Sequence, residues 1–217
     1  MAAKRRPLIA GNWKMNGLKK DVRALAGALG TRMAKTVRPP FEMLVCPPAP
    51  LIGPVADALR GKRIAVGGQD CHANAAGAHT GDVSAEVLKS LGCKYVIVGH
   101  SERRADHDES NSDVRAKAAA AHAAGLIAII CIGETLKQRE AGRTKKVNKK
   151  QLAASLPKGA DARNTVIAYE PVWAIGTGKV ATPEQAQEVH AMIRAELAKR
   201  LSAEEADKMR ILYGGSM

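Results

Sequence analysis

Leu126-Ile127-Ala128-Ile129-Ile130 is the stretch that decides the fold class, because five consecutive apolar residues fit a strand that is buried on both faces. Strands of this kind belong to parallel sheets that helices cover on both sides. The apolar character continues to position 132, and similar short runs recur along the chain. We predict a strand at each of these places: 8–13, 43–46, 64–68, 95–99, 126–132, 166–169 and 211–213.

Helical patterns separate the predicted strands, with apolar residues three or four positions apart among Ala, Leu, Arg, Lys and Glu. The clearest of them lie at 21–35, 114–124 and 183–201. Strictly alternating strands and helices imply parallel pairing through helical crossovers. The pattern alone permits an open doubly wound sheet or a closed barrel of eight units. No G-x-G-x-x-G follows the first strand to favour dinucleotide binding.

The composition fits one sizeable core, since the chain has 217 residues and 46% of them are apolar. We therefore predict a single domain over residues 1–217. No run approaches the roughly 18 apolar residues of a membrane span. The basic start of the chain runs into a predicted strand and not into the apolar stretch of a signal peptide. We expect a soluble, cytoplasmic protein.

Four cysteines stand singly, at positions 46, 71, 93 and 131, and none belongs to a C-x-x-C pair. Such spacing fits reduced thiols better than a disulfide framework or a zinc site. We therefore expect no metal ion and no disulfide.

The chain is strongly basic, with 34 Lys and Arg against 21 Asp and Glu and a net charge of +13. Such a balance fits either a nucleic-acid partner or an attraction for small anionic molecules. Seven basic residues face one acid between positions 137 and 150, which is typical of a solvated helix face. The chain has one Phe, three Tyr and two Trp, so it offers few side chains on which bases could stack. We expect no nucleic-acid partner.

Polar side chains follow three of the predicted strands. Lys14 lies just after the first strand, His100 after the fourth and Glu170 after the sixth. In an α/β barrel the carboxyl ends of the strands meet on one rim, where active sites collect. A barrel would therefore bring a lysine, a histidine and a glutamate to the same place.

Four longer motifs resemble the triosephosphate isomerase family: G-N-W-K-M-N at 11–16, V-G-H-S-E-R-R at 98–104, Y-E-P-V-W-A-I-G-T-G-K at 169–179 and Y-G-G-S at 213–216. They occur in the family's order and spacing. The resemblance implies a (β/α)8 TIM barrel that needs no cofactor. It also implies an isomerase that interconverts dihydroxyacetone phosphate and D-glyceraldehyde 3-phosphate by enediolate proton transfer, in glycolysis and gluconeogenesis.

The given sequence departs from the family pattern at its end, because it stops at Met217 and lacks the eighth strand and helix. A rival interpretation is a catalytically silent truncated barrel that acts as a folding or assembly unit. Unpaired strand edges and a loosely held substrate would both lower activity. We expect at most a trace of isomerase activity from the 217-residue chain alone, and restored activity once an eighth βα unit is added.

The resemblance also implies a role for individual residues. Glu170 resembles the catalytic base, and His100 resembles the electrophile that acts while neutral on the substrate carbonyl. Lys14 resembles the fixed positive charge beside the developing enediolate and the phosphate. Asn12 and Glu102 resemble the supporting residues that orient Lys14 and His100.

Phosphate binding is implied at two further places. Residues 171–179 resemble a mobile lid, in which Gly176 offers a backbone N–H to the phosphate. Ser216 resembles part of the next phosphate-binding turn. We expect Asn12, Lys14, Gly176 and Ser216 to bind the substrate.

The loop 71–81 resembles the family's protruding interface loop. In that arrangement Thr80 lies close to the partner subunit's Lys14. The resemblance thus implies a homodimer that binds triose phosphates.

Overall fold

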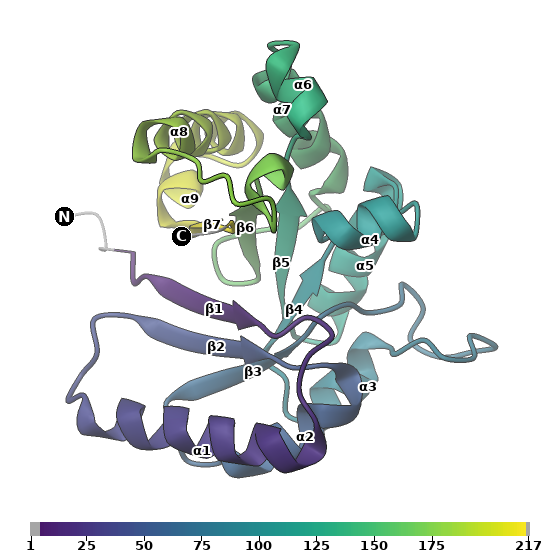
Figure 1. Cartoon of the computed structure of the whole chain (residues 1–217). Helices are drawn as coiled ribbons and strands as arrows, with labels where there is room; N and C mark the ends of the chain where they lie inside the picture. Colours follow the sequence, from purple (N-terminus) through teal and green to yellow (C-terminus); the bar gives the residue numbers. More distant parts are fainter. Residues whose placement is uncertain (1–4, 216–217) are drawn as a thin grey trace. The chain divides into compact units, whose positions relative to one another are not determined.

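The computed structural model describes residues 5–215 (Figure 1). Each of the predicted strands is present there, and their bounds are β1 Leu8–Asn12, β2 Glu42–Cys46, β3 Ile64–Gly68, β4 Tyr95–Val98, β5 Ile127–Ile132, β6 Thr165–Tyr169 and β7 Ile211–Tyr213. The connecting helices are α1 Lys19–Lys35, η1 Ala49–Leu51, α2 Ile52–Ala58, α3 Ala85–Ser90, α4 Ser101–Asp106, α5 Asn111–Ala123, α6 Leu136–Glu140, α7 Thr144–Ser155, η2 Val172–Ala174, α8 Pro183–Arg200 and α9 Ala203–Lys208.

The strands pair in chain order from β1 to β7. The neighbours β1 and β2, β2 and β3, β3 and β4, and β6 and β7 are parallel. A doubly wound sheet reverses its strand order at a switch point, and this order has no reversal. Of the two architectures that the pattern permitted, the singly wound order of a βα barrel is the one found.

Helix boundaries differ slightly from the predicted ones, and local hydrogen bonds explain where the helices begin. α8 starts at Pro183, as predicted, because Thr182 and Gln185 form a reciprocal capping box. Proline at the first helical position loses no helical hydrogen bond. α1 starts at Lys19, two residues before the predicted 21–35, and its N-cap Leu18 contributes no side-chain bond. A helix start without a polar cap leaves little signal in the sequence.

Contacts within the chain divide it into two compact units. Within the described residues, the first unit comprises 5–97 and 120–128, and the second comprises 98–119 and 129–215. The prediction of a single domain over 1–217 is not tested by this division and stays a prediction.

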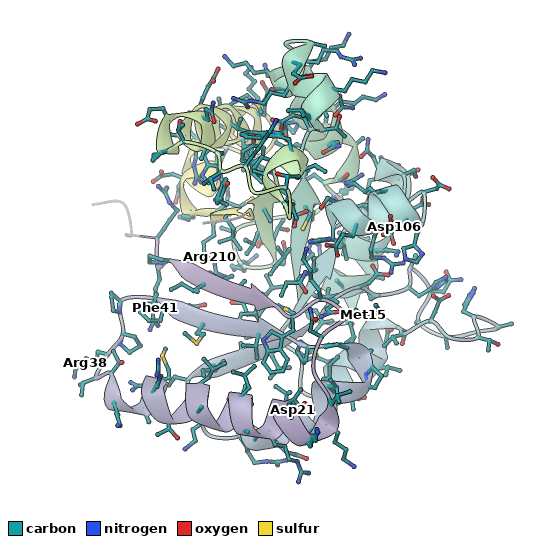
Figure 2. The ribbon with its side chains drawn as sticks, in the orientation of Figure 1. Met15, Asp21, Arg38, Phe41, Asp106 and Arg210 are labelled. Atoms are coloured by element: carbon teal, nitrogen blue, oxygen red, sulfur yellow. The ribbon has the colours of Figure 1, made fainter. Side chains whose placement is uncertain are left out.

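In the first unit, β1 lies beside β2 in parallel register, with Leu8 opposite Glu42 and Asn12 opposite Cys46. The ends of the two strands are therefore level, and the loop that follows β1 starts at the carboxyl edge of this part of the sheet. Met15 in that loop is 95% exposed (Figure 2).

In the second unit, β6 lies beside β7, with Tyr169 opposite Tyr213. Helix α8 packs against both α7 and α9. Buried apolar side chains from the strands and helices form the core of this unit, among them Ile130, Ile167, Leu152, Ile193 and Leu197. Within residues 5–215, no helix is both long enough and apolar enough to cross a membrane.

Candidate active site

Glu170 directly follows β6, and its carboxylate meets His100 in the second unit. Oε1 of Glu170 lies 3.4 Å from Nε2 of His100. Oε2 accepts a hydrogen bond of 3.0 Å from the backbone N–H of Ser101, the first residue of α4. Both Glu170 and His100 are buried. A carboxylate and an imidazole that are shielded from water and within about 3.5 Å of each other are suited to proton transfer.

The contacts of His100 show which ring nitrogen carries its proton. His100 is the N-cap of α4, and its Nδ1 lies 3.3 Å from the backbone nitrogen of Glu102. A backbone N–H can only donate, so Nδ1 accepts, and the proton of a neutral imidazole is then on Nε2. The Glu102 carboxylate also lies 3.5 Å from Nδ1, but this side chain is 47% exposed to water, whereas the backbone donor is fixed by the start of α4. The ring therefore presents its Nε2–H toward Glu170.

Two glycines leave the space that Glu170 occupies. A Cβ atom on Gly133, just after β5, would lie 1.7 Å from the carbonyl oxygen of Glu170. A Cβ atom on Gly214, just after β7, would lie 3.1 Å from its Cγ. The backbone N–H of Glu170 donates to Ile132, at 2.7 Å. The ends of three neighbouring strands thus close around the candidate base, and only glycine fits at Gly133.

A buried carboxylate beside this site holds the start of the predicted lid. Glu134 is fully buried and accepts hydrogen bonds from the indole N–H of Trp173, at 2.9 Å, and from the hydroxyl of Tyr169, at 3.1 Å. The amide of Asn148 donates to its other oxygen, at 2.9 Å. Burial and the nearby Glu134 charge raise the pKa of Tyr169, so its hydroxyl stays protonated and remains a donor. The Arg139 guanidinium lies 4.5 Å above the Trp173 ring.

The predicted lid, 171–179, combines an anchored start with an exposed second half. It opens with the single turn of η2, and the hydroxyl of Thr177 donates to the carbonyl of Trp173, at 2.6 Å. Residues 176–179 are exposed. Gly176 has a φ of 68° and Gly178 a φ of 75°, which glycine adopts without strain. Their backbone is therefore accessible to a ligand.

Lys14 lies in the first unit, directly after β1, in a left-handed conformation with a φ of 52°. Its N–H donates to Oδ1 of Asn12, at 2.9 Å, and its carbonyl accepts from the side-chain amide of Gln69, at 2.8 Å. The same amide also donates to the carbonyl of Cys46, at 2.8 Å. A non-glycine residue in this conformation costs on the order of 1 kcal/mol or more, so these bonds hold a strained peptide in place.

The predicted interface loop, 71–81, also belongs to the first unit, and Thr80 within it is exposed. Figure 1 shows the segment between β3 and α3 extending away from the helices and strands of its own unit. Among residues 5–215, this segment also holds the one group of metal-ligating side chains that lie together, with ligand atoms of His72, His79 and Asp82 within 4.8 Å of one another. Asn74 engages both imidazoles, its N–H on His72 and its side-chain amide on His79. The expectation of no metal stays a prediction.

The predicted site residues are divided between the units. The first unit contains Asn12, Lys14 and Thr80, and the second contains His100, Glu102, Glu170 and Gly176. Within the second unit His100, Glu102 and Glu170 come together. Within the first unit Asn12 contacts Lys14. Ser216 lies outside the described residues.

Comparison with known proteins now decides the family, because the family model described as Triosephosphate isomerase matches residues 7–217. The chain belongs to the triosephosphate isomerase family. It is 56% identical over 217 residues to the triosephosphate isomerase of Afipia carboxidovorans, covering 100% of this chain and 85% of that protein. It is 55% identical over 212 residues to that of Bradyrhizobium diazoefficiens, covering 98% of this chain and 83% of that protein.

The crystal structure of the triosephosphate isomerase from Bartonella henselae superimposes with a TM-score of 0.87 at 46% identity, and the match covers 98% of this chain and 84% of that one. The fold class is therefore the TIM barrel, and the described residues contribute seven parallel strands to it. The family membership also makes the chain an isomerase. The resemblance predicted from the four motifs is confirmed by these comparisons.

Within each unit, the structure identifies further residues that contact the predicted site residues or the predicted lid and that were given no role in the sequence analysis. Gln69 directly follows β3 and Glu134 lies two residues after β5, so the strand-end rule that found Lys14 would have flagged both. Ser101 contributes a backbone N–H, which leaves no side-chain signal in a sequence. Its role depends on the helix start that His100 caps.

Proposed function

We propose that the chain interconverts dihydroxyacetone phosphate and D-glyceraldehyde 3-phosphate, in glycolysis and gluconeogenesis. The observation that carries the proposal is the position of Glu170, 3.4 Å from the Nε2 of His100, in a chain of the triosephosphate isomerase family. Isomerising a hydroxyketone phosphate moves a proton from one carbon to its neighbour through an enediolate. A movable carboxylate and a neutral hydrogen-bond donor are the groups that this chemistry needs.

Glu170 acts as the base in this proposal. It takes a proton from C1 of dihydroxyacetone phosphate, the C–H electron pair forms the C1–C2 double bond, and the carbonyl electrons move to the oxygen on C2. The protonated carboxyl then returns the proton to C2, which leaves the aldehyde at C1. The backbone N–H of Ser101 holds the carboxylate when no substrate is bound, and Glu170 gives up this hydrogen bond when it moves to the substrate.

His100 and Lys14 stabilise the enediolate. Nε2–H of His100 donates to the oxygen on C2, and the ring passes a proton between the two enediolate oxygens, starting and ending neutral. The backbone N–H of Glu102 on Nδ1 supports this role, because it selects the tautomer with the proton on Nε2. The Lys14 ammonium supplies a positive charge to the same oxygen and to the phosphate, with its backbone positioned by Asn12.

The substrate phosphate binds to the backbone N–H of Gly176 and to the turn that contains Ser216. Closing the lid over it excludes water, which matters because an enediolate phosphate exposed to water eliminates its phosphate group. The exposed second half of the lid and its buried anchor at Trp173 support such a hinged closure. The interface loop with Thr80 then docks against a second copy of the chain to form a homodimer.

The silent truncated barrel is the other interpretation, and the match to named isomerases over the whole chain does not favour it. Turnover of the chain in a coupled assay distinguishes the two. If the chain is an enzyme, its isomerisation rate should exceed the rate in buffer and should depend on Glu170, even if it is only a trace. A rate that the Glu170→Gln change leaves untouched would indicate a silent chain with a contaminating activity.

The base assignment predicts that Glu170→Asp folds normally and lowers kcat by about 100-fold or more, with a much smaller change in KM. The shorter side chain withdraws the carboxylate by one methylene from the reacting carbon. Steady-state kinetics measure both constants. Glu204→Asp, on the exposed α9, is the matched control and should leave kcat unchanged. A near-normal kcat for Glu170→Asp would remove this residue from the role.

The cationic role of Lys14 predicts that Lys14→Met abolishes turnover and weakens binding of the inhibitor phosphoglycolate, while circular dichroism shows an intact fold. The charge is lost beside a phosphate in a water-poor site, where such an attraction is strong. Lys19→Met, on the exposed start of α1, is the control. Inhibitor affinity that is the same for Lys14→Met and for the unaltered chain, at two ionic strengths, would contradict contact between Lys14 and the ligand.

A further inference from the structure

A group of cations on α6, α7 and the turn between them is not used by the proposed reaction. Figure 1 shows α6 and α7 next to each other at one end of the second unit. We call their exposed basic side chains the cationic face. Its members are Lys137, Arg143, Lys145, Lys146, Lys149 and Lys150.

Several of these cations occupy positions that are unfavourable in an isolated helix. The first turn of α7 contains Lys145 and Lys146 and no acidic residue, although the positive end of a helix dipole favours acids there. Lys149 and Lys150 follow one turn later, so like charges stand four residues apart on the same surface. Both features destabilise the helix. Such an arrangement suggests that the charges serve an interaction outside the helix.

Neighbouring acids neutralise only part of the cationic face. Lys145 pairs with Glu188 at 2.9 Å, and Lys149 pairs with Glu196 at 3.0 Å, both across to α8. In the part of the chain that the structure describes, the remaining four cations have no acidic partner; they are Lys137, Arg143, Lys146 and Lys150. Their charge is available to an external anion.

The rest of α7 shows which class of polyanion fits. Its largest apolar residue, Leu152, is fully buried, and none of its other apolar residues is exposed, so no apolar stripe is left to enter a membrane surface. The cationic face also contains no aromatic side chain, and single-stranded nucleic acids are usually held by stacking their bases on aromatic rings. A group of exposed cations without either feature fits the phosphates of a duplex, which a protein can bind by charge alone.

We propose that the cationic face binds the phosphate backbone of double-stranded DNA without reading its sequence. This departs from the expectation, based on composition, that the chain has no nucleic-acid partner. That expectation rested on the small number of aromatic residues, which matter for stacking on unpaired bases. Contact with duplex phosphates does not need aromatic side chains. The inference is independent of the proposed isomerase reaction, because none of its residues belongs to that site.

Fluorescence anisotropy with a labelled duplex of about 20 base pairs tests the proposal over a range of salt concentrations. The informative variant is the double change Lys146→Gln and Lys150→Gln. We expect about a tenfold or greater loss of affinity at low salt, and a log–log salt slope that is smaller by about two, one for each phosphate contact removed. Thermal unfolding should show no loss of stability, because the variant removes like-charge repulsion within α7.

The matched control is the double change Lys19→Gln and Lys20→Gln, which removes the same charge from the exposed first turn of α1. This control variant should lower the affinity for the duplex by less than about twofold if the cationic face is the binding site. Equal losses in both double variants would overturn the proposal, since the net charge alone would then explain binding. It would also be overturned by an absence of duplex binding at low salt. Binding of the face to phosphatidylserine vesicles, without binding of duplex DNA, would assign the face to membranes instead.

Discussion

At the residue scale, the candidate base is positioned by groups that are far away in the sequence. Glu170 accepts a hydrogen bond from Ser101, 69 positions earlier, and its own N–H donates to Ile132. Its backbone passes so close to Gly133 that no side chain fits between them. The geometry of the site therefore depends on small backbone distances as much as on the reactive side chains.

The close approach predicts that Gly133→Ala misplaces the base. The new methyl group would lie 1.7 Å from the carbonyl oxygen of Glu170, so the ends of β5 and β6 must move apart. A shift of about 1 Å at a catalytic carboxylate lowers kcat by about 100-fold, and the strain should also lower the unfolding temperature. Kinetics and thermal unfolding measure the two effects.

Gly27→Ala is the control for this change, because a Cβ atom on Gly27 meets nothing within 4 Å. At this half-buried position inside α1, alanine should stabilise the chain by up to about 1 kcal/mol over glycine. If Gly133→Ala kept both the kcat and the unfolding temperature of the unaltered chain, the close contact around Glu170 would not exist in solution.

At the element scale, α4 and α5 are joined by a carboxylate in the loop between them. Glu109 receives hydrogen bonds from Arg103 on α4 and from Lys117 on α5, and its side chain is only 6% exposed. Burial alone would raise the pKa of Glu109, but the hydrogen bonds from Lys117 and Arg103 lower it below its ordinary value. His100 is the N-cap of α4, so the contacts of Glu109 with α4 help to fix the position of the candidate electrophile.

The lowered pKa of Glu109 gives this joint a defined pH dependence. A carboxylate whose pKa is lower in the folded chain stabilises the fold at any pH above its unfolded value of about 4.5, and that stability is lost as the pH falls through the folded value. Glu109→Gln should therefore lower the free energy of unfolding by about 1 to 3 kcal/mol at pH 7, because two partly buried cations lose their charged partner. The difference from the unaltered chain should shrink steadily below about pH 4.

Urea unfolding at a series of pH values measures this difference. Glu204→Gln, which removes an exposed pair with Lys208 on α9, should change stability by less than about 0.5 kcal/mol. A loss for Glu109→Gln that stays constant between pH 7 and pH 3 would show that the charge of Glu109 is not what joins the two helices.

At the scale of the whole molecule, the question is whether a second copy completes the protein. The predicted interface loop has an exposed Thr80 near its end, and Gly77 and Gly81, both with positive φ, shape the turn around it. Backbone hydrogen bonds order this loop, and its residues 74–78 are exposed, so they do not belong to the core of their own unit. The proposed homodimer gives it a role.

Thr80→Arg should yield monomers with poor activity, because a bulky charge would enter a packed pocket of the partner. Sedimentation velocity at micromolar concentration measures the oligomeric state. Thr31→Arg, on the exposed surface of α1, adds the same charge outside the loop and should leave the state unchanged. A Thr80→Arg variant that sediments as a dimer would place the interface elsewhere.

By itself the sequence determined the fold class and the family, and it supplied the candidates for the reactive side chains. Apolar runs buried on both faces dictate parallel strands, and local patterns suffice to locate them because strand and helix periodicity are properties of neighbouring residues. Boundaries were less certain. Leu126 opens the predicted strand 126–132, yet its N–H bonds to Ala121 at the end of α5, so β5 begins one residue later.

Only the tertiary structure decided how these residues are used. The proton of His100 is placed on Nε2 by a backbone N–H, and Glu134 becomes the buried anchor of Trp173 although the two are 39 positions apart. Likewise Lys145 and Lys149 are neutralised by α8, whereas Lys146 and Lys150 are not, and nothing in the run 137–150 distinguishes them. The physical reason is the same in each case: hydrogen bonds and ion pairs act over about 3 Å, and which groups come that close depends on how distant elements pack.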